Sequence, residues 1–403
     1  MIRVGHVFDR AVGWSQRVAV SQLIDRLPRE EFAQFLGAID ARAVDVLGSL
    51  PAKIELLSRS GWLSLPAGPA IRRFAERHRV DVLHAWGTTA AVGCSAVRYR
   101  LDPTGLSAAP TSTEANSISR IGDDDTIRKV PLVVSLVDPG FGEREARLLR
   151  TIARPEGFAI ACESGTVRRR LIERGLDDAA CVLIRPGVDF AAINRTKRSG
   201  LRATLGFAEG DRVAIVHEPM TRHGGQSDAS WAATLFGSGA EGLHCILPGD
   251  SREAARIARR SAGQPSVAPP VRTNGKYPFE SLLSVSDVLV LAAPGDIPTT
   301  AIAWAMASRT AIIGSAVPCV AEYIAHKVNG LLFKIAKDRS TVISIAKLLA
   351  DRESQARCAA AAHGQAYEVF SIRRTIDQYA SLYRNLFAGA PPGRGIADPA
   401  AIG

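Results

Sequence analysis

Short apolar runs and amphipathic stretches alternate along the first half of the chain. The runs have the length and residue types of buried strands, and the stretches between them repeat apolar residues at helical spacing. The expected strands are Ile2–Phe8, Ile54–Leu57, Asp81–His84, Pro131–Val137, Phe158–Cys162 and Cys181–Ile184. The expected helices are Ser15–Leu27, Pro66–Arg79, Thr88–Val97, Glu143–Ala153 and Ser164–Arg174. This order predicts a parallel sheet with right-handed crossovers.

A second alternating set follows Arg185–Ser199, a segment that breaks the pattern and is typical of a connection between domains. The expected elements are the strands Val213–His217 and Leu243–Leu247 and the helices Asp228–Phe236, Ser251–Ser261, Arg339–Arg352, Glu353–Glu368 and Ser371–Leu386. We therefore expect domains at 1–190 and 191–370, a final helix at 371–387 and a disordered tail at 388–403. Leu101–Lys129 is rich in Ser, Thr, Pro, Asp and Gly and predicts a mobile loop.

The stretch Ser286–Phe333 combines most of these signals. Val288–Leu291 predicts a strand, the following Pro and Gly predict a turn, and Pro298 opens a predicted helix at Thr299–Ala307. A second strand is expected at Thr310–Ile313. Open α/β sheets bind ligands where a strand's carboxyl end leads into a helix, because the free N–H groups and the helix dipole favour anions. The same pattern also fits a βαβ unit that only packs.

Composition and charge narrow the class of protein. The chain has 403 residues, 46% of them hydrophobic, which indicates a globular protein. No apolar run is long enough to span a membrane and no signal-peptide core is present, so we expect a cytoplasmic protein. Six scattered cysteines without a CxxC pair indicate neither a zinc site nor a disulfide framework. The net charge of +10 allows peripheral contact with an anionic membrane.

Two arginine clusters and the glycine pattern exclude further classes. Arg168–Arg170 and the second cluster, Arg256, Arg259 and Arg260, lie in helical patterns that predict solvated faces, and no aromatic residues interleave with them. We therefore expect no nucleic acid partner. No GxGxxG follows a predicted strand, which disfavours a dinucleotide-dependent oxidoreductase.

Several motifs, in order and spacing, resemble those of retaining GT-B glycosyltransferases of family 4, which transfer a sugar from a nucleotide-sugar. They cover roughly residues 1–388: DVLHAWG at Asp81–Gly87, CVLIRPGVDF at Cys181–Phe190, LGF at Leu205–Phe207, LHCILPGD at Leu243–Asp250, AMAS at Ala305–Ser308 and VAEYIAHKVNGLLF at Val320–Phe333. The resemblance implies an α/β protein of GT-B type, with two Rossmann-like parallel-sheet domains facing a cleft and a C-terminal helix that crosses back to the first domain.

The resemblance also implies roles for particular residues. The second domain would bind the donor and the first domain the acceptor, a glycan or a lipid, without a cofactor or a metal. The implied donor-binding residues are Gly13, Arg222, His223, Asp296, Pro298, Thr299, Thr300 and Trp304. The acceptor-side candidates are His84 and Asp138.

Four positions depart from the family's chemical pattern. Trp304 stands where the family has its second glutamate, and Glu218 and His223 stand where it has an arginine and a lysine for the diphosphate. Val137 replaces a histidine of the first domain. An indole has no acceptor for ribose hydroxyls, and a glutamate repels a diphosphate.

Three hypotheses therefore remain open at this point. The first is a divergent retaining glycosyltransferase, in which backbone N–H groups of Ile297–Thr300 help to hold the donor. The second is a catalytically inactive GT-B protein that binds a glycan or a partner. The third, ranked last, is an epimerase or another nucleotide-sugar enzyme, for which Asp138, Glu163 and Glu218 are the acid/base candidates.

Overall fold

The computed structural model describes most of the chain, and all that follows refers to these residues. They are 1–9, 12–48, 50–57, 67–97, 130–136, 142–154, 156–197, 200–208, 210–217, 243–248, 252–262, 271–273, 276–293, 295, 297–336 and 340–393. They form two compact units. The first consists of residues 1–162, 168–184 and 376–396, and the second consists of residues 163–167, 185–375 and 397–403, each counted with its undescribed residues.

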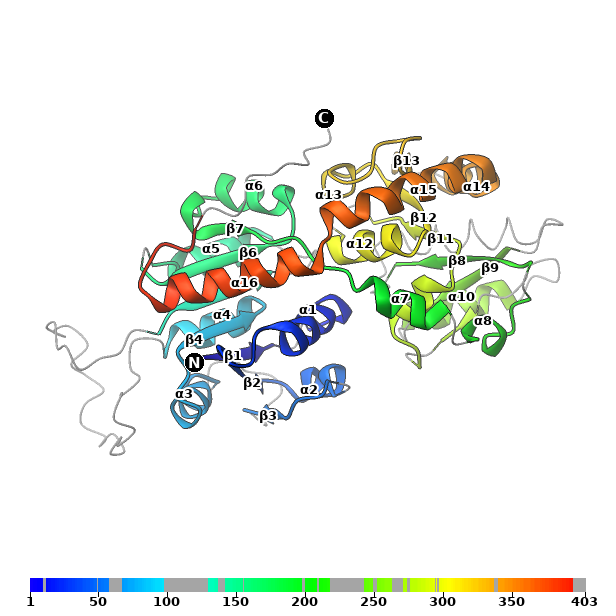
Figure 1. The fold of residues 1–403 in the computed structure, drawn as a ribbon. Helices are drawn as coiled ribbons and strands as arrows, with labels where there is room; N and C mark the ends of the chain where they lie inside the picture. The colour runs from blue at the N-terminus through cyan, green and yellow to red at the C-terminus, as the bar shows by residue number, and fades with distance from the viewer. Residues whose placement is uncertain are drawn as a thin grey trace, which may run out of the picture. The chain divides into compact units, whose positions relative to one another are not determined.

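The first unit is built on a seven-stranded parallel sheet (Figure 1). Its strands are β1 (Ile2–Phe8), β2 (Phe32–Ala38), β3 (Ile54–Leu56), β4 (Val82–Trp86), β5 (Leu132–Leu136), β6 (Phe158–Cys162) and β7 (Cys181–Leu183). They lie in the order β3-β2-β1-β4-β5-β6-β7, with Ile2 opposite Phe32 and Val4 opposite Val82. The order reverses between β1 and β4, which is the arrangement of a doubly wound sheet.

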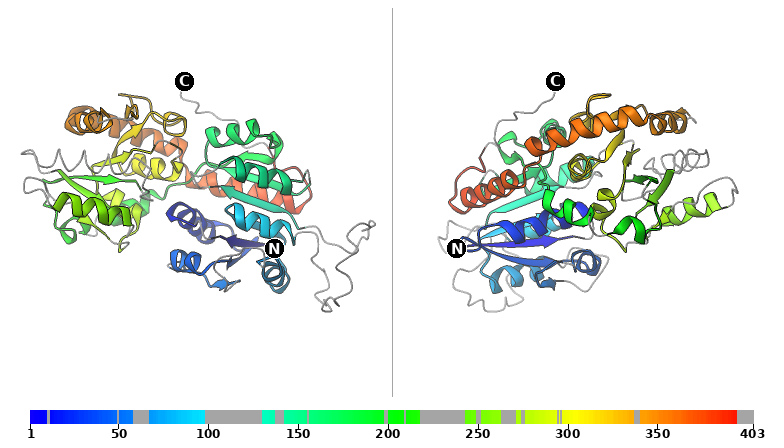
Figure 2. Two further views of the ribbon diagram at one scale, coloured as in Figure 1. Left: turned by 180° about the vertical axis from the view of Figure 1, so that it is seen from behind. Right: turned by 45° about the vertical axis from the view of Figure 1, so that its right-hand side comes forward.

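Helices connect these strands and cover the sheet. They are α1 (Trp14–Arg26), α2 (Ala41–Leu47), α3 (Ala67–Arg77), α4 (Thr88–Ser95), α5 (Glu143–Ile152), α6 (Gly165–Glu173), the short η2 (Asp178–Ala180) and α16 (Ile372–Phe387). Figures 1 and 2 show α16 on one face of the sheet and α5 on the other. From Ile376 onward α16 belongs to the first unit, although the chain reaches it from the second, so the expected crossing of the last helix is present.

The second unit has a six-stranded parallel sheet in the order β10-β9-β8-β11-β12-β13. Its strands are β8 (Arg212–Val216), β9 (Leu243–Leu247), β10 (Val271–Arg272), β11 (Val288–Leu291), β12 (Ala311–Ser315) and β13 (Leu331–Phe333). Its helices are α7 (Phe190–Lys197), α8 (Leu201–Thr204), α10 (Arg252–Ala262), α11 (Phe279–Ser284), α12 (Thr299–Ala307), α13 (Pro318–Ala321), α14 (Ser340–Ala350) and α15 (Arg352–Val369).

Strands β8, β11 and β12 form the centre of the second unit's core. Val216, Val290 and Ile313 have no exposed surface and pack in one apolar cluster. Near-continuous apolar runs of this kind are expected where helices cover both faces of a parallel sheet.

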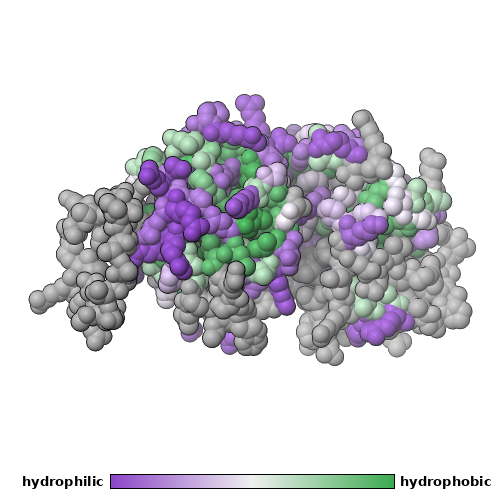
Figure 3. Space-filling view, turned by 90° about the horizontal axis from the view of Figure 1, so that it is seen from below, coloured by the Kyte–Doolittle hydropathy of each residue, from purple (hydrophilic) through white to green (hydrophobic). Residues whose placement is uncertain are grey.

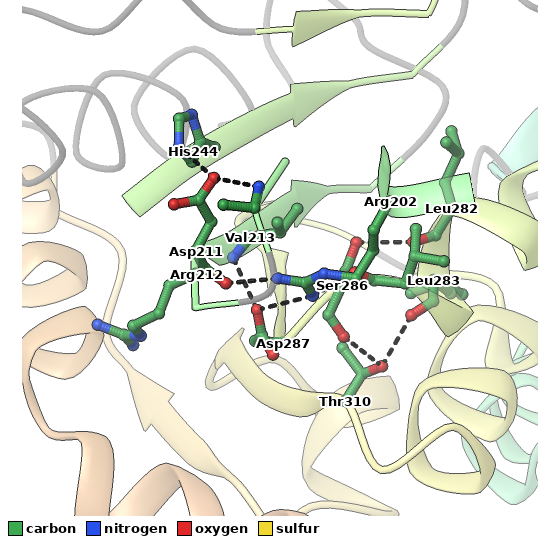
Figure 4. A network of polar contacts seen from close by, with 12 residues as sticks. Arg202, Asp211, Arg212, Val213, His244, Leu282, Leu283, Ser286, Asp287 and Thr310 are labelled. Atoms are coloured by element: carbon green, nitrogen blue, oxygen red, sulfur yellow. Dashed lines mark hydrogen bonds and ion pairs between the residues drawn. The ribbon is translucent and has the colours of Figure 1, made fainter. Parts of the chain in front are cut away.

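A polar network joins the amino ends of these strands (Figure 4). Asp287 accepts a hydrogen bond from the Val213 N–H at 2.8 Å, and Arg202 donates to the Val285 carbonyl at 2.9 Å. The Thr310 hydroxyl bonds the carbonyls of Leu283 and Ser286 at 3.0 and 3.2 Å. These bonds satisfy buried backbone groups at the amino ends of the strands. The carboxyl ends of the strands lie at the opposite end of the sheet.

Several details differ from the sequence-based expectation. Strands β2 and β10 and helices α2 and α11 were not predicted; in β2, Phe32–Ala38 mixes small and polar residues and contains Gly37. The change of unit lies at Ile184–Arg185 instead of after residue 190, and residues 163–167 belong to the second unit. Residues 388–393 of the expected disordered tail are described, and the N–H groups of Gly389 and Ala390 bond to the end of α16. The predicted helix Asp228–Phe236 and the loop Leu101–Lys129 lie outside the described residues.

In the described part of the chain, no helix combines the length and the apolar character that a membrane crossing requires. The face drawn in Figure 3 shows hydrophilic and hydrophobic residues side by side.

Candidate functional site

The strand order of the second sheet marks where a ligand is expected. Strands β9 and β10 extend the sheet on one side of β8, whereas β11 begins the other side, so the order reverses between β8 and β11. Ligands of doubly wound sheets bind at the carboxyl ends of the strands at this reversal. His217 follows β8 there, and the chain leaving β11 leads into α12.

Helix α12 presents an uncharged and buried amino end. Pro298 is its N-cap, with φ −56° and ψ 126°, and no side chain of the helix caps it. Thr299 and Thr300 form its first turn and are 2% and 1% exposed. Because this turn carries no acidic residue, the helix dipole and the free N–H groups attract an anion from outside the helix.

In the structure the carboxyl group of Glu163 lies at this amino end. The segment containing Glu163 lies between β6 and α6 but belongs to the second unit. Its Oε1 lies 3.4 Å from the Thr300 hydroxyl, and the N–H groups of Thr299 and Thr300 also bond to the carboxyl group. Glu163 is 9% exposed, and this burial raises the pKa of its carboxyl group to about 8 against the lowering effect of the Thr299 and Thr300 hydrogen bonds.

Neighbouring contacts fix the residues that approach α12. The Ile297 N–H donates to the Sγ atom of Cys319 at 3.2 Å, and the Ser315 hydroxyl donates to the Ala293 carbonyl at 2.6 Å. The Tyr323 hydroxyl donates to the backbone carbonyl of Glu163 at 3.3 Å. The N–H groups of Ile297, Thr299 and Thr300 are therefore all engaged within the protein.

Several buried polar atoms have no partner among the described residues, and two of them belong to α12 and to the end of β8. One is the indole Nε1 of Trp304, a side chain that is 4% exposed, and the other is Nε2 of His217, which is also 4% exposed. The His217 ring meets Phe279 edge to face at 5.9 Å, and burial lowers its pKa to about 3, so the ring is neutral. Unpaired buried polar atoms are rare in native proteins and mark places where a ligand or water is expected.

The first unit holds two of the predicted site residues. Gly13 is the N-cap of α1, and its N–H donates to the Gln16 Oε1 at 2.8 Å. His84 is completely buried, with Nδ1 hydrogen-bonded to the Tyr383 hydroxyl at 2.7 Å and Nε2 to the Ser135 hydroxyl at 2.8 Å. Both ring nitrogens thus already have protein partners.

The structure brings Pro298, Thr299, Thr300 and Trp304 together on the first turns of one helix. The other positions singled out from the sequence, Val137, Asp138, Glu218, Arg222, His223 and Asp296, lie outside the described residues. In the described part of the chain, no group of His, Cys, Asp and Glu side chains is arranged to hold a metal ion. Sequence reasoning named Glu163 only as an acid/base candidate and did not single out His217.

One model of a known protein family matches part of the second unit. The family model described as "Glycosyl transferases group 1" matches residues 279–365, which run from α11 into α15 and include the junction between β11 and α12. No curated protein sequence matches the chain.

Solved structures match the chain over nearly its whole length. Anabaena HepE in complex with UDP and glucose has a TM-score of 0.70 at 16% identity, over 94% of this chain and 98% of that chain. Sucrose-phosphate synthase from Thermosynechococcus elongatus has a TM-score of 0.68 at 14% identity, over 97% and 100%. The chain has the GT-B fold.

The same fold is shared with a different class of enzyme. A Listeria monocytogenes protein assigned as a UDP-N-acetylglucosamine 2-epimerase has a TM-score of 0.65 at 14% identity, over 98% of this chain and 100% of that chain. Because fold does not determine chemistry, the function has to be argued from the site.

Proposed function

We propose that this protein is a retaining glycosyltransferase that transfers a sugar from a nucleotide-sugar to an acceptor. The observation that carries the proposal is the group 1 glycosyltransferase match, which encloses the junction between β11 and α12 at the reversal of the strand order. The uncharged amino end of α12 is suited to a diphosphate, because N–H groups and the helix dipole stabilise its negative charge. Anabaena HepE, which has the same fold, was solved with UDP-glucose.

In this proposal the second unit binds the donor through a small set of residues. Thr299 and Thr300 supply N–H groups to the diphosphate, and Trp304 and His217 supply the buried polar atoms that still lack partners. Arg222, His223 and Asp296 complete the donor site, as the family resemblance implies. Gly13 and Asp138 remain donor-side and acceptor-side candidates by the same resemblance, whereas His84 is buried and hydrogen-bonded through both ring nitrogens and is a structural residue. The acceptor is a glycan or a lipid.

The chemistry needs little from a protein acid or base. The enzyme stabilises the leaving nucleoside diphosphate electrostatically, and the bound geometry holds the acceptor hydroxyl close to the anomeric carbon. The proposed residues are therefore binding and positioning groups.

The test is a panel of UDP-, GDP- and ADP-sugars assayed for hydrolysis, transfer and binding. We expect one nucleotide class to bind, with sugar released or transferred and the anomeric configuration retained, as judged by NMR of the product. Absence of both binding and turnover across the panel would refute the proposal. Inversion of configuration would refute retention alone, and conversion of UDP-N-acetylglucosamine to its 2-epimer would support an epimerase instead.

A catalytically inactive protein that binds a glycan or a partner is the second candidate. The observation that favours it is that Glu163 already engages the Thr299 and Thr300 N–H groups that a diphosphate would need. It predicts that a glycan array or a protein partner gives binding while no nucleotide-sugar changes the melting temperature. A clear thermal shift with any nucleotide-sugar would contradict it.

A further inference from the structure

Glu163 and Glu322 make the same kind of contact with two different helices. The Glu322 carboxylate accepts the Gly165 and Thr166 N–H groups at 2.8 and 2.7 Å and so caps α6, while Glu163 engages the amino end of α12. The two helices differ in their relation to the proposed donor site. Helix α6 has no role in the proposed donor site, whereas α12 is where the diphosphate is proposed to bind.

We propose that Glu163 is the gate of the donor site: its carboxyl group occupies the amino end of α12, and a nucleoside diphosphate binds there only after the carboxyl group has moved away. This inference rests on the proposed function. One helix terminus cannot offer the same N–H groups to two acceptors at full strength, so Glu163 and the diphosphate compete.

Trp304 indicates independently that the amino end of α12 binds a group other than the Glu163 carboxyl group. It lies one helical turn beyond Thr300 on the same side of α12, and helical side chains lean toward the amino end of their helix. Its indole N–H is buried and has no partner among the described residues while Glu163 is in place. A phosphate or sugar oxygen at this end would provide the missing acceptor, which the Glu163 carboxyl group does not.

The charge state of Glu163 decides how strongly it competes. With a pKa of about 8, the carboxyl group is mainly neutral at neutral pH and becomes anionic in mild alkali. Of the ionisable side chains near this segment, Tyr323 donates its hydroxyl to the Glu163 carbonyl at 3.3 Å, and Glu322 accepts the N–H groups of Gly165 and Thr166, which follow along the chain. An anionic Glu163 both holds the N–H groups more tightly and repels a diphosphate, so the gate closes as pH rises.

The test measures the affinity for UDP by calorimetry, near neutral pH and about two pH units higher, with GDP and ADP as alternatives. For Glu163→Ala we expect a dissociation constant about tenfold lower than that of the unaltered protein near neutral pH. Glu163→Gln keeps the shape of the neutral carboxyl group, so its affinity should match the unaltered protein near neutral pH. In alkali it should bind about tenfold more tightly, because only the unaltered protein acquires the charge.

Glu145→Gln is the matched control, because Glu145 accepts the Gly142 N–H at 2.9 Å and caps α5 in the first unit. It should leave the affinity and its pH dependence unchanged. The titration of the uracil ring is common to all variants and cancels when they are compared at one pH.

The outcomes separate the gate from the proposed function. Tighter binding by Glu163→Ala, or binding by this variant alone, supports the gate. If the unaltered protein binds a nucleotide and both Glu163 variants bind it equally well or more weakly at both pH values, Glu163 only caps α12 and the gate is refuted. If no variant binds any nucleoside diphosphate, the proposed function fails and the gate fails with it.

Discussion

Buried histidines in the two units differ in whether all their ring nitrogens have hydrogen-bond partners. In the first unit, His84 is hydrogen-bonded through both ring nitrogens, and His6 donates from Nε2 to the Gln34 Oε1 at 3.1 Å while accepting from the Trp86 indole at 3.2 Å. In the second unit, His217 leaves Nε2 without a partner among the described residues. A ring whose polar atoms are all satisfied holds a fold together, whereas a buried atom left unpaired indicates a ligand.

The largest effect expected from this contrast is a difference in pH stability between the units. Burial lowers the pKa of His6 to about 4 and holds that of His84 well below its usual value, so neither ring is charged when folded. The unfolded chain binds these protons from about pH 6.5 downward, so the stability they confer is present above that pH and is lost as pH falls toward 4.

In the second unit, burial lowers the pKa of one histidine, His217, and raises the pKa of the Glu163 carboxyl group. The two groups therefore change the stability in opposite directions as the pH changes. His217 acts as His6 and His84 do, but the raised pKa of Glu163 gives stability that is present at low pH and is lost as pH rises through about 8. Each group contributes up to about 1.4 kcal/mol per pH unit within its window. Hydrogen exchange should show β1 and β4 opening first in acid, and β8 and β11 opening first in mild alkali. The same order of opening at both extremes would contradict the assignment.

A smaller effect is expected from removing one member of the His84 network. His84→Ala leaves the buried hydroxyls of Tyr383 and Ser135 without this partner and creates a cavity, so we expect a loss of about 3 kcal/mol in the free energy of unfolding. Tyr383→Phe removes a single bond and should lose about 1 kcal/mol. Urea denaturation measures both. A loss for His84→Ala no larger than that for Tyr383→Phe would mean that the network does not stabilise the first unit.

Sequence reasoning recovered most of the two sheets because hydrophobic runs such as Val288–Leu291 keep their pattern whatever surrounds them. It failed for β2, whose alternation is weakened by Gln34 and Gly37. It also placed Thr299 and Thr300 at the start of α12, because Pro298 marks a helix start in the sequence.

The sequence alone did not predict contacts between residues that lie far apart in the chain. Glu163 and Thr300 are 137 positions apart, and nothing in their local patterns indicates that they meet. The raised pKa of Glu163 depends on burial that only the assembled unit creates. Unpaired atoms such as the Trp304 Nε1 are likewise a property of the packed structure, because an amino-acid sequence lists donors but does not show which of them find acceptors.

A further small change in stability is expected at Trp304 itself. Trp304→Phe removes an N–H group that has no partner among the described residues and keeps an aromatic ring in the helix packing. Losing an unpaired donor offsets part of the loss of volume, so we expect a destabilisation below about 1.5 kcal/mol. If the indole binds the donor, the affinity for UDP should nevertheless fall about tenfold.

Trp86→Phe is the matched control in the first unit, because the Trp86 indole donates to the His6 Nδ1 inside the core. This variant leaves a buried acceptor unpaired, so it should lose more stability than Trp304→Phe and leave the affinity for UDP unchanged. Calorimetry and urea denaturation of the two variants therefore measure the contrast between the units directly. If Trp304→Phe lost stability but no affinity, the unpaired indole would be a packing defect, and the donor site would have to be sought elsewhere than at the amino end of α12.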